Sequence, residues 1–204
     1  VRATTRDPGY GDRMSIFKAY DVRGIYPQEL DEGLMRKIGN ATAQYLGADR
    51  IVVSRDMRVS GESLMRAFID GATDAGADCS DAGLLPTPGN YFAIASYGLK
   101  GGAAITASHN PKQYNGVKVS REEAIPVGLE SGLGDIEKMV NAGNYKKAAK
   151  KGKVSTISVL DDLTKHVLKV VGDIRPLKVV IDAGNGMAGL TLPPILAKLP
   201  IKTT

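Results

Sequence analysis

Apolar and polar positions along the chain recur with two periods, one typical of helices and one typical of strands. Helical spacing between capping and breaking residues predicts helices over residues 31–46, 60–75, 87–97 and 132–142. Short β-rich or apolar runs predict strands over residues 50–53, 77–81, 102–107 and 114–120. Asp31, Ser60 and Thr87 occupy positions at which helix N-caps are expected. Because strands and helices alternate, the pattern predicts an α/β fold.

A shorter set of elements follows a lysine-rich stretch in the second half of the chain. Residues 154–159 fit a strand or an extended connector, and residues 160–171 have the pattern of an amphipathic helix. Residues 178–181 fit a buried strand. So few elements cannot enclose a core of their own. We therefore interpret residues 16–150 as an N-terminal domain and residues 151–204 as the incomplete start of a second α/β domain.

Composition adds limits on size and partners. With 204 residues and 43% hydrophobic residues, the chain can bury a core, and the absence of Trp leaves the packing to aliphatic side chains. The net charge of +5 comes from one tract. This tract could bind a polyanion, but a solvated helix end or linker is favoured because no arginine or aromatic pattern accompanies it, so we expect no nucleic-acid partner. Its lysines are Lys146, Lys147, Lys150, Lys151 and Lys153.

The cellular setting follows from features that the chain lacks. Cys79 is the only cysteine, so no intrachain disulfide can form. No apolar stretch approaches membrane-spanning length, so we expect no membrane partner. Residues 1–15 have no signal-peptide core, and we expect a flexible extension or a vector remnant in which Met14 could be the natural start. A reducing, cytoplasmic location is therefore expected.

The segment from residue 106 to residue 118 carries the candidate chemistry, and it reads Thr-Ala-Ser-His-Asn-Pro-Lys-Gln-Tyr-Asn-Gly-Val-Lys. A buried strand leads into it, and Pro111 keeps the preceding residue out of the helical region, so the chain must turn. An Asn-Gly pair marks a second turn before an extended run resumes. A strand, a polar loop and a returning strand would aim Ser108 and Lys118 into one space. A serine near a lysine can be a nucleophile with a base beside it.

Other interpretations of these residues are possible. Ser108 could be an ordinary loop serine, and the G-x-S-x-G elbow of esterases is absent. A zinc site at His109 is improbable because the only other histidine, His166, lies on a helix of the next module. Residues 184–189 formally match G-x-G-x-x-G, but no acidic residue follows Asp182 and prolines interrupt the next helix. A glycine turn is therefore favoured over a dinucleotide site.

Three segments together resemble the alpha-D-phosphohexomutase family, of the phosphomannomutase/phosphoglucomutase type. The serine loop is similar to the family's phosphoserine loop over residues 106–111 and 114–118. Residues 17–24, Phe-Lys-Ala-Tyr-Asp-Val-Arg-Gly, resemble its N-terminal active-site loop, and residues 179–186 resemble the opening strand and turn of its second domain. The resemblance implies a three-layer domain with a mixed sheet between helices, followed by the beginning of a second similar domain.

The resemblance also implies roles for individual residues. Ser108 would carry a phosphoryl group, and Mg²⁺ would contact the phosphate on Ser108. Lys118 would transfer protons and Arg23 would bind phosphate oxygens, with His109 as a further catalytic residue. The alternatives are a surface lysine at a strand end for Lys118 and a local ion pair with Asp21 for Arg23. On the same ground, Tyr20 and Asn110 would contact the sugar. Arg55, Asp56 and Arg58 follow a strand and could lie near the site, but we assign them no role from the sequence.

The implied function is intramolecular phosphotransfer between hexose 6-phosphate and hexose 1-phosphate, with mannose or glucose as the sugar. A bisphosphorylated sugar would be the intermediate, and a sugar 1,6-bisphosphate the activator. The chain lacks the family's Asp-Gly-Asp-x-Asp-Arg metal loop, its Gly-Glu-x-Ser-Gly-His segment and its C-terminal phosphate-binding loop. We therefore expect an N-terminal fragment that needs the missing C-terminal domains and is inactive alone. The alternative is a catalytically silent α/β module that binds phosphate or only assembles with a missing half.

Overall fold

The computed structural model describes residues 15–204, so the predicted extension over residues 1–15 lies outside the described residues except for Ser15. The α-helices are α1 (Glu32–Leu46), α2 (Gly61–Asp74), α3 (Thr87–Ser96), α4 (Leu133–Asn141), α5 (Leu160–Val171) and α6 (Ala188–Leu196), and two short 3₁₀ turns are η1 (Glu122–Ala124) and η2 (Leu129–Ser131). The strands are β1 (Val22–Ile25), β2 (Arg50–Arg55), β3 (Asp78–Leu84), β4 (Gly101–Ile105), β5 (Tyr114–Arg121), β6 (Val154–Thr156), β7 (Leu177–Val179) and β8 (Ile201–Thr203).

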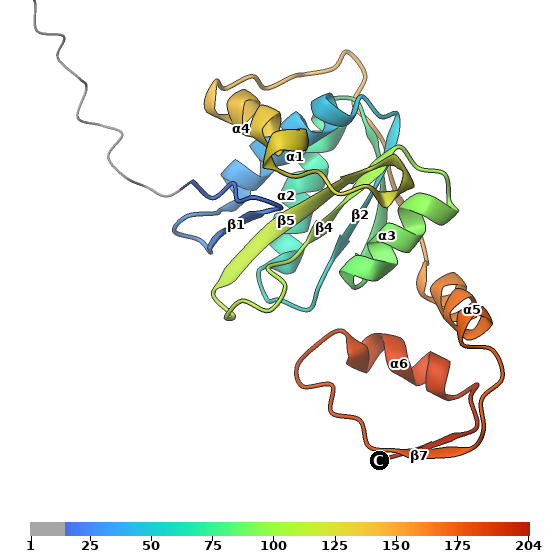
Figure 1. Cartoon of the computed structure of the whole chain (residues 1–204). Helices are drawn as coiled ribbons and strands as arrows, with labels where there is room; N and C mark the ends of the chain where they lie inside the picture. The colour runs from blue at the N-terminus through green and yellow to red at the C-terminus, as the bar shows by residue number, and fades with distance from the viewer. Residues whose placement is uncertain (1–14) are drawn as a thin grey trace, which may run out of the picture.

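Three layers make up the larger part of the molecule (Figure 1). A six-stranded sheet has the strand order β1-β5-β4-β2-β3-β6. The pairs β1–β5 and β5–β4 are antiparallel, whereas the four strands from β4 to β6 are parallel. Helices α1, α2 and α4 cover one face and α3 covers the other. The prediction of a three-layer α/β domain with a mixed sheet is confirmed.

Two hydrophobic clusters separate the layers. The larger cluster lies between the sheet and α1, α2 and α4, and the smaller one joins β2 to α3 and to the start of α5. Helices α1 and α2 cross very closely: a Cβ on Gly71 would lie 1.9 Å from the carbonyl oxygen of Arg36, and one on Gly39 would lie 2.1 Å from that of Phe68. Only glycine permits such an approach of two backbones.

Helix starts follow the predictions in part. Asp31 is the N-cap of α1, and its carboxylate accepts a hydrogen bond from the Leu34 amide at 2.7 Å. Ser60 is the N-cap of α2, but its hydroxyl accepts from Asn115 Nδ2 at 2.9 Å and caps no helix amide. The prediction of Thr87 as a cap is wrong, because Thr87 is the first residue of α3 and Pro86 precedes it in extended conformation. Proline near a helix start needs no amide partner, which permits this earlier entry.

Strand β1 was not expected from the local sequence. Its four residues pair with β5, and Val22 and Val117 lie opposite each other in the larger core cluster. A Cβ on Gly116 would lie 2.0 Å from the carbonyl oxygen of Val22. The close pairing of β1 with β5 therefore depends on a glycine at position 116.

Residues 144–153, here called the lysine strap, lead from α4 along α1 and α2 toward β6. The side chain of Asn40 on α1 accepts from the Lys146 amide at 2.8 Å and donates to the Lys146 carbonyl at 2.9 Å. The Ala148 amide donates to the Asp74 carbonyl at 2.8 Å, and Lys151 Nζ lies 3.2 Å from the Asp74 carboxylate. The strap is thus attached through its main chain as well as its charges.

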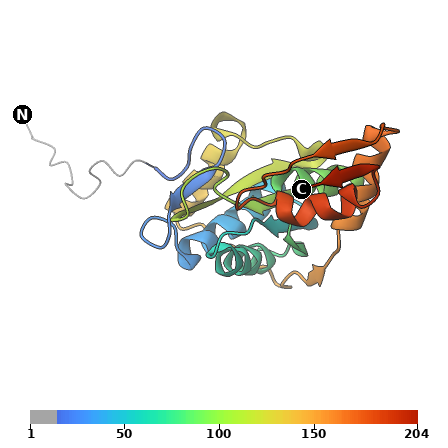
Figure 2. The same cartoon turned by 90° about the horizontal axis from the view of Figure 1, so that it is seen from below.

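The last elements, β7, α6 and β8, lie outside the six-stranded sheet (Figure 2). The division of the chain at residue 150 stays a prediction, but β6 is the sixth strand of the first sheet and Val159 and Leu163 pack in its smaller core cluster. Beyond α5, the parallel pair β7–β8 and helix α6 stand beside the larger unit. Within residues 15–204, none of the helices has the length and apolar character needed to cross a bilayer.

Candidate active site

The serine loop, residues 106–114, lies at the carboxyl end of the parallel strands. Strand β4 ends at Ile105, which pairs with Arg55 at the end of β2, so the loops after β2 and β4 leave the same edge of the sheet. In open α/β sheets, this edge is where ligands bind. The topology therefore places Ser108 beside the segment that follows β2.

Ser108 lies at an exposed position of the loop in an unusual backbone conformation. Its φ is +56°, in the left-handed region that side-chain-bearing residues seldom adopt. Its amide donates to Thr106 Oγ1 at 2.9 Å, and its hydroxyl oxygen lies 3.3 Å from Nδ1 of His109. A strained backbone of this kind persists only when surrounding contacts hold it in place, and it is found most often at functional sites. Ser108 and His109 therefore lie side by side, with the serine hydroxyl open to solvent.

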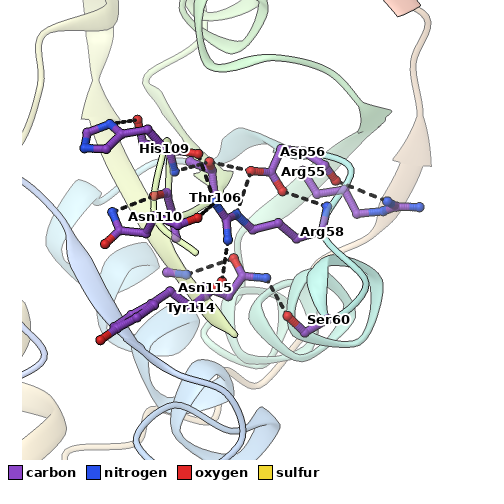
Figure 3. A network of polar contacts seen from close by, with 12 residues as sticks. Arg55, Asp56, Arg58, Ser60, Thr106, His109, Asn110, Tyr114 and Asn115 are labelled. Carbon is purple, nitrogen blue, oxygen red and sulfur yellow. Dashed lines mark hydrogen bonds and ion pairs between the residues drawn. The ribbon is translucent and has the colours of Figure 1, made fainter. Parts of the chain in front are cut away.

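The side chain of Arg58 points into the serine loop (Figure 3). Its side chain is 8% exposed, and its Nη1 atom donates to the carbonyls of Pro111 at 2.9 Å and Tyr114 at 2.8 Å. Nη2 donates to the carbonyls of Ser108 at 2.9 Å and Asn110 at 2.7 Å. One guanidinium thus bonds to four carbonyl oxygens across the whole loop.

Asp56 completes this network from the end of β2. Its carboxylate accepts from Thr106 Oγ1 at 2.7 Å, from the Arg58 amide at 3.1 Å and from Arg58 Nε at 3.3 Å. Thr106 in turn accepts from the Ser108 amide. Asp56 therefore orients both the arginine and the threonine that hold the serine. We name Asp56, Arg58, Thr106 and Ser108 the serine-loop network.

Asn110, which the resemblance placed against the sugar, is engaged within the loop. Its amide and its side-chain Nδ2 both donate to the Ala107 carbonyl, at 3.1 Å and 3.0 Å. At the far end of the loop, Asn115 Oδ1 accepts from the Gly116 amide at 2.8 Å and leads the chain into β5. Asn110 keeps its side-chain oxygen for another donor, so its role toward a sugar stays a prediction.

A second polar cluster forms where β1 meets β5. Asp21 is 5% exposed, and its carboxylate bonds to the guanidinium of Arg23 and, at 3.1 Å, to Nζ of Lys118. Both cations are half-buried, and Nε of Arg23 is buried without a hydrogen-bond partner among the described residues. We name these three residues the Asp21 cluster. The alternative of a local ion pair between Arg23 and Asp21 is present in the structure, whereas the bond from Lys118 to the same carboxylate was not expected.

Ser108 and Lys118 share an edge of the sheet but do not touch. Lys118 is opposite Ala104 in the β4–β5 ladder, and no hydrogen bond joins it to Ser108 among the described residues. An ammonium that pairs with a carboxylate can donate a proton or hold an anionic oxygen, whereas it must lose its proton before acting as a base. Contact of one substrate with both Ser108 and Lys118 therefore stays a prediction.

Tyr20 lies outside both clusters. Its side chain is 76% exposed and lines a hollow of about 400 Å³ with residues of η2. The Leu129 amide donates to the Ala19 carbonyl at 2.9 Å, which holds the Tyr20 segment against this turn. An exposed tyrosine on a fixed segment can stack on or bond to a ligand, so the predicted sugar contact remains open to test.

A metal site is not assembled by the described residues alone. Within residues 15–204, no group of three or more His, Cys, Asp or Glu side chains is placed to hold a metal ion. Ser108 could supply one oxygen through a phosphate, but a magnesium ion takes six oxygen ligands in near-octahedral geometry. The side chains present therefore do not by themselves fit the predicted Mg²⁺.

Comparison with known proteins identifies the class of protein to which this fold and loop belong. The family model for phosphoglucomutase/phosphomannomutase, alpha/beta/alpha domain I, matches residues 14–147. The phosphomannomutase of Salmonella montevideo is 39% identical over 192 residues, which is 92% of this chain, and one from Escherichia coli is 41% identical over 182 residues, or 87% of it. The chain belongs to the phosphoglucomutase/phosphomannomutase family, as the motif resemblance predicted.

A solved structure agrees with this assignment. A phosphoglucomutase/phosphomannomutase family protein from Burkholderia thailandensis superposes with a TM-score of 0.84 at 34% identity, over 93% of this chain and 43% of its own. The chain spans 42% of the Salmonella relative and 40% of the Escherichia coli one. Because more than half of each relative has no counterpart in this chain, the activity and substrates of a whole protein are proposals.

Proposed function

We propose that this chain carries the phosphoryl-transferring serine of a hexose phosphate mutase that interconverts hexose 6-phosphate and hexose 1-phosphate, with mannose or glucose as the sugar. The observation that supports this most is Ser108 itself. Its hydroxyl is exposed while its backbone is held in the left-handed region by a buried network. The phosphomannomutase names of the relatives support the same substrate class.

In the first half of the reaction, phosphorylated Ser108 donates its phosphoryl group to a free sugar hydroxyl. The bond between phosphorus and Ser108 Oγ breaks while a bond from phosphorus to the sugar oxygen forms. The proton of the sugar hydroxyl passes to a base, and Ser108 Oγ takes up a proton. His109 Nδ1, 3.3 Å from Ser108 Oγ, is placed to exchange that second proton.

The bisphosphorylated sugar then turns over, and its other phosphoryl group is transferred to Ser108. This step restores the phosphorylated serine and releases the isomeric monophosphate, so the enzyme ends as it began. A sugar 1,6-bisphosphate would supply the first phosphoryl group. Tyr20 and Asn110 are the residues that we assign to the sugar hydroxyls.

The Asp21 cluster provides charge for these steps. Arg23 has a fixed positive charge and a buried Nε without a partner among the described residues, so it can bind a phosphate oxygen. In the second transfer, Lys118 can donate a proton to the sugar oxygen that leaves as its phosphoryl group returns to Ser108, or stabilise the charge that develops there. Mg²⁺, with most of its ligands from outside these residues, would neutralise charge on the transferred phosphate.

Replacement of Ser108 by alanine tests the proposal. In the full-length protein, Ser108→Ala should abolish turnover of sugar monophosphate, because no other group can carry the phosphoryl group covalently. Intact mass after incubation with a sugar 1,6-bisphosphate should show one added phosphoryl group in the wild type and none in the variant. Ser96→Ala, at an exposed serine near the end of α3, is the matched control and should behave like wild type.

Near-normal turnover of the Ser108→Ala protein would remove the phosphoserine from the proposal. The alternative of a silent phosphate-binding module predicts a different pattern, in which the full-length protein binds sugar phosphate but never isomerises it. We also expect the 204-residue polypeptide alone to be inactive, because it contains no acidic metal loop. Positioning can account for about 7–11 kcal/mol of a barrier, and one domain cannot hold a sugar phosphate at both ends.

A further inference from the structure

We infer that Arg58 is a positioning residue that sets the reactivity of Ser108 by fixing the serine loop through its main chain. This inference rests on the proposed function, because it concerns the serine that would carry the phosphoryl group. It assigns a role to a side chain that sequence motifs left without one. The inference depends on the hydrogen-bond capacity of the guanidinium, its burial and the shape of the loop that it holds (Figure 3).

All the donor positions of Arg58 are occupied by protein acceptors. A guanidinium has five N–H donors and no acceptor. Nη1 and Nη2 use theirs on four carbonyl oxygens between Ser108 and Tyr114, and Nε donates to Asp56 at 3.3 Å. Arg58 therefore has no donor left for a phosphate and acts through the loop rather than on the substrate.

The acceptors explain why the loop needs this side chain. Four carbonyls converge on one point because the chain turns back between Ser108 and Tyr114, and converging carbonyl dipoles repel one another. These hydrogen bonds are exposed or partly buried, and a single guanidinium has enough donors to hold four converging carbonyls at once. Removal of the guanidinium would leave those carbonyls to rotate toward water, which changes the backbone at Ser108.

Asp56 makes the arrangement specific. It neutralises the buried cation through Nε and at the same time accepts from Thr106, whose oxygen accepts from the Ser108 amide. The loop is thus held on both sides of the serine, at its amide through Thr106 and at its carbonyl through Arg58. This double attachment keeps φ of Ser108 at +56°.

Lysine cannot replace this arginine. An ammonium is a compact point charge with three donors, so at most three of the five acceptors would be satisfied, and without the planar geometry. Arg58→Lys keeps the charge and most of the volume, so it separates geometry from electrostatics. Arg55→Lys is the matched control. Arg55 is the last residue of β2, its side chain pairs with Glu62 at 3.6 Å and donates to the Asp56 carbonyl at 3.3 Å, and it makes no hydrogen bond to the serine loop among the described residues.

Amide hydrogen exchange is the first measurement, because it does not depend on activity. In Arg58→Lys, we expect exchange of the Ser108, Asn110 and Tyr114 amides to accelerate by about tenfold or more. In Arg55→Lys, the same amides should exchange at the wild-type rate. Unchanged exchange of these amides in Arg58→Lys would overturn the inference, whatever the activity of the variant.

Turnover of the full-length protein is the second measurement. A loop displacement of about 1 Å can cost on the order of 10²-fold in rate, so kcat of Arg58→Lys should fall by about that factor while KM changes little. In Arg58→Ala, added guanidinium chloride at low concentration should restore part of kcat by refilling the vacated site. A merely structural residue would instead lower the melting temperature and leave kcat of the folded fraction unchanged, which would also overturn the inference.

The two proposals fail in different ways. Full activity of Ser108→Ala would remove the phosphoserine role, while the exchange rates would still report whether Arg58 fixes the loop. An inactive Ser108→Ala beside a fully active Arg58→Lys would leave the phosphoserine in place and remove the positioning role.

Discussion

Two networks in this molecule pair an arginine with a carboxylate, one through the buried guanidinium of Arg58 and the other through the exposed guanidinium of Arg36, and they use the pair in different ways. At the serine loop, Arg58 directs its donors to main-chain carbonyls, so that the adjacent serine hydroxyl remains free and exposed. At the lysine strap, Arg36 donates to the Asp74 carboxylate at 2.6 Å and to the Tyr145 hydroxyl at 2.9 Å, so side chains bond mainly to one another. The first arrangement shapes a reactive loop, whereas the second fastens a surface segment.

The electrostatics of the strap network agree with this difference. Bonds from the Tyr145 hydroxyl and the Arg36 guanidinium, with Lys151 nearby, hold the pKa of the Asp74 carboxyl far below its usual range. Burial, together with the bond to Asp74, raises the pKa of the Tyr145 hydroxyl. A charge that is stabilised this strongly in the folded state contributes to folding. Variants of the strap should therefore change stability, and variants of the active-site edge should change rate.

Lys118→Met is expected to lower the rate most while leaving the stability almost unchanged. Turnover of the full-length protein should fall by about 10²- to 10⁴-fold, the usual contribution of a group that transfers a proton in catalysis. The melting temperature should change little, because Lys118 is half-buried and borders the active-site edge. Lys100→Met is the matched control, since Lys100 also pairs with a carboxylate, Glu122, but at the opposite end of the sheet. A large loss of stability with turnover preserved in the folded fraction would make Lys118 structural.

Asp74→Asn should show the reverse pattern. Loss of the charge weakens the bonds from Arg36, Tyr145 and Lys151, so the free energy of unfolding should fall by about 1–3 kcal/mol. Turnover of the folded protein should be retained, because the strap lies away from the serine loop. Asp70→Asn provides the comparison. Asp70 is exposed and its ion pair with Lys151 is long, at 3.9 Å, so the change in the free energy of unfolding should stay within about 1 kcal/mol. Urea unfolding of both variants measures the difference, and equal effects would refute the special position of Asp74.

Acid unfolding gives a third, smaller contrast. The pKa of Asp74 is lower in the folded state than its ordinary value of 3.8, so its stabilisation is complete above that pH and declines as the pH falls below it. Stability of the wild type should therefore decrease below about pH 4 more steeply than that of Asp74→Asn, which has no such group to protonate. Parallel curves for the two proteins would show that Asp74 does not titrate as the strap geometry requires.

The smallest effect is expected at the exposed lysines of the strap. Lys147 is exposed and has no ion pair among the described residues, so Lys147→Ala should change the free energy of unfolding by less than about 0.5 kcal/mol. Turnover should also be unchanged. A substantial loss of either would mean that the lysine tract has a role beyond the attachment made by Lys146 and Lys151.

Local patterns were sufficient for most of the architecture and for the serine loop. Periodicity located the helices that cover the sheet, and the predicted polar loop between two strands is present between β4 and β5. The strand at residues 22–25 was missed because its pairing partner is remote in sequence and its own four residues carry no clear alternation. Contacts between distant segments are not visible in a local pattern.

The same limit explains why the role of Arg58 and the contact between Asp21 and Lys118 were missed. Arg58 reaches carbonyls 50 to 56 positions away, and Asp21 bonds to a lysine 97 positions away. One signal was available for Arg58: residues that follow a parallel strand gather at the edge of the sheet where the next parallel strand also ends. Because β2 and β4 are both followed by polar segments, that rule could have placed Arg58 beside the serine loop.

The pairing of β1 with β5 has a consequence for biosynthesis. Strand β1 cannot pair until β5 has been synthesised, and the contacting residues Asp21 and Lys118 are 97 positions apart. At synthesis rates of about 5–20 residues per second, roughly 5–20 s pass on the ribosome between these two residues. During that interval the apolar face of β1 has no strand to pair with, and long-range pairing of this kind is slow to form. The cluster that would hold the sugar phosphate is therefore among the last parts of this sheet that a nascent chain can complete.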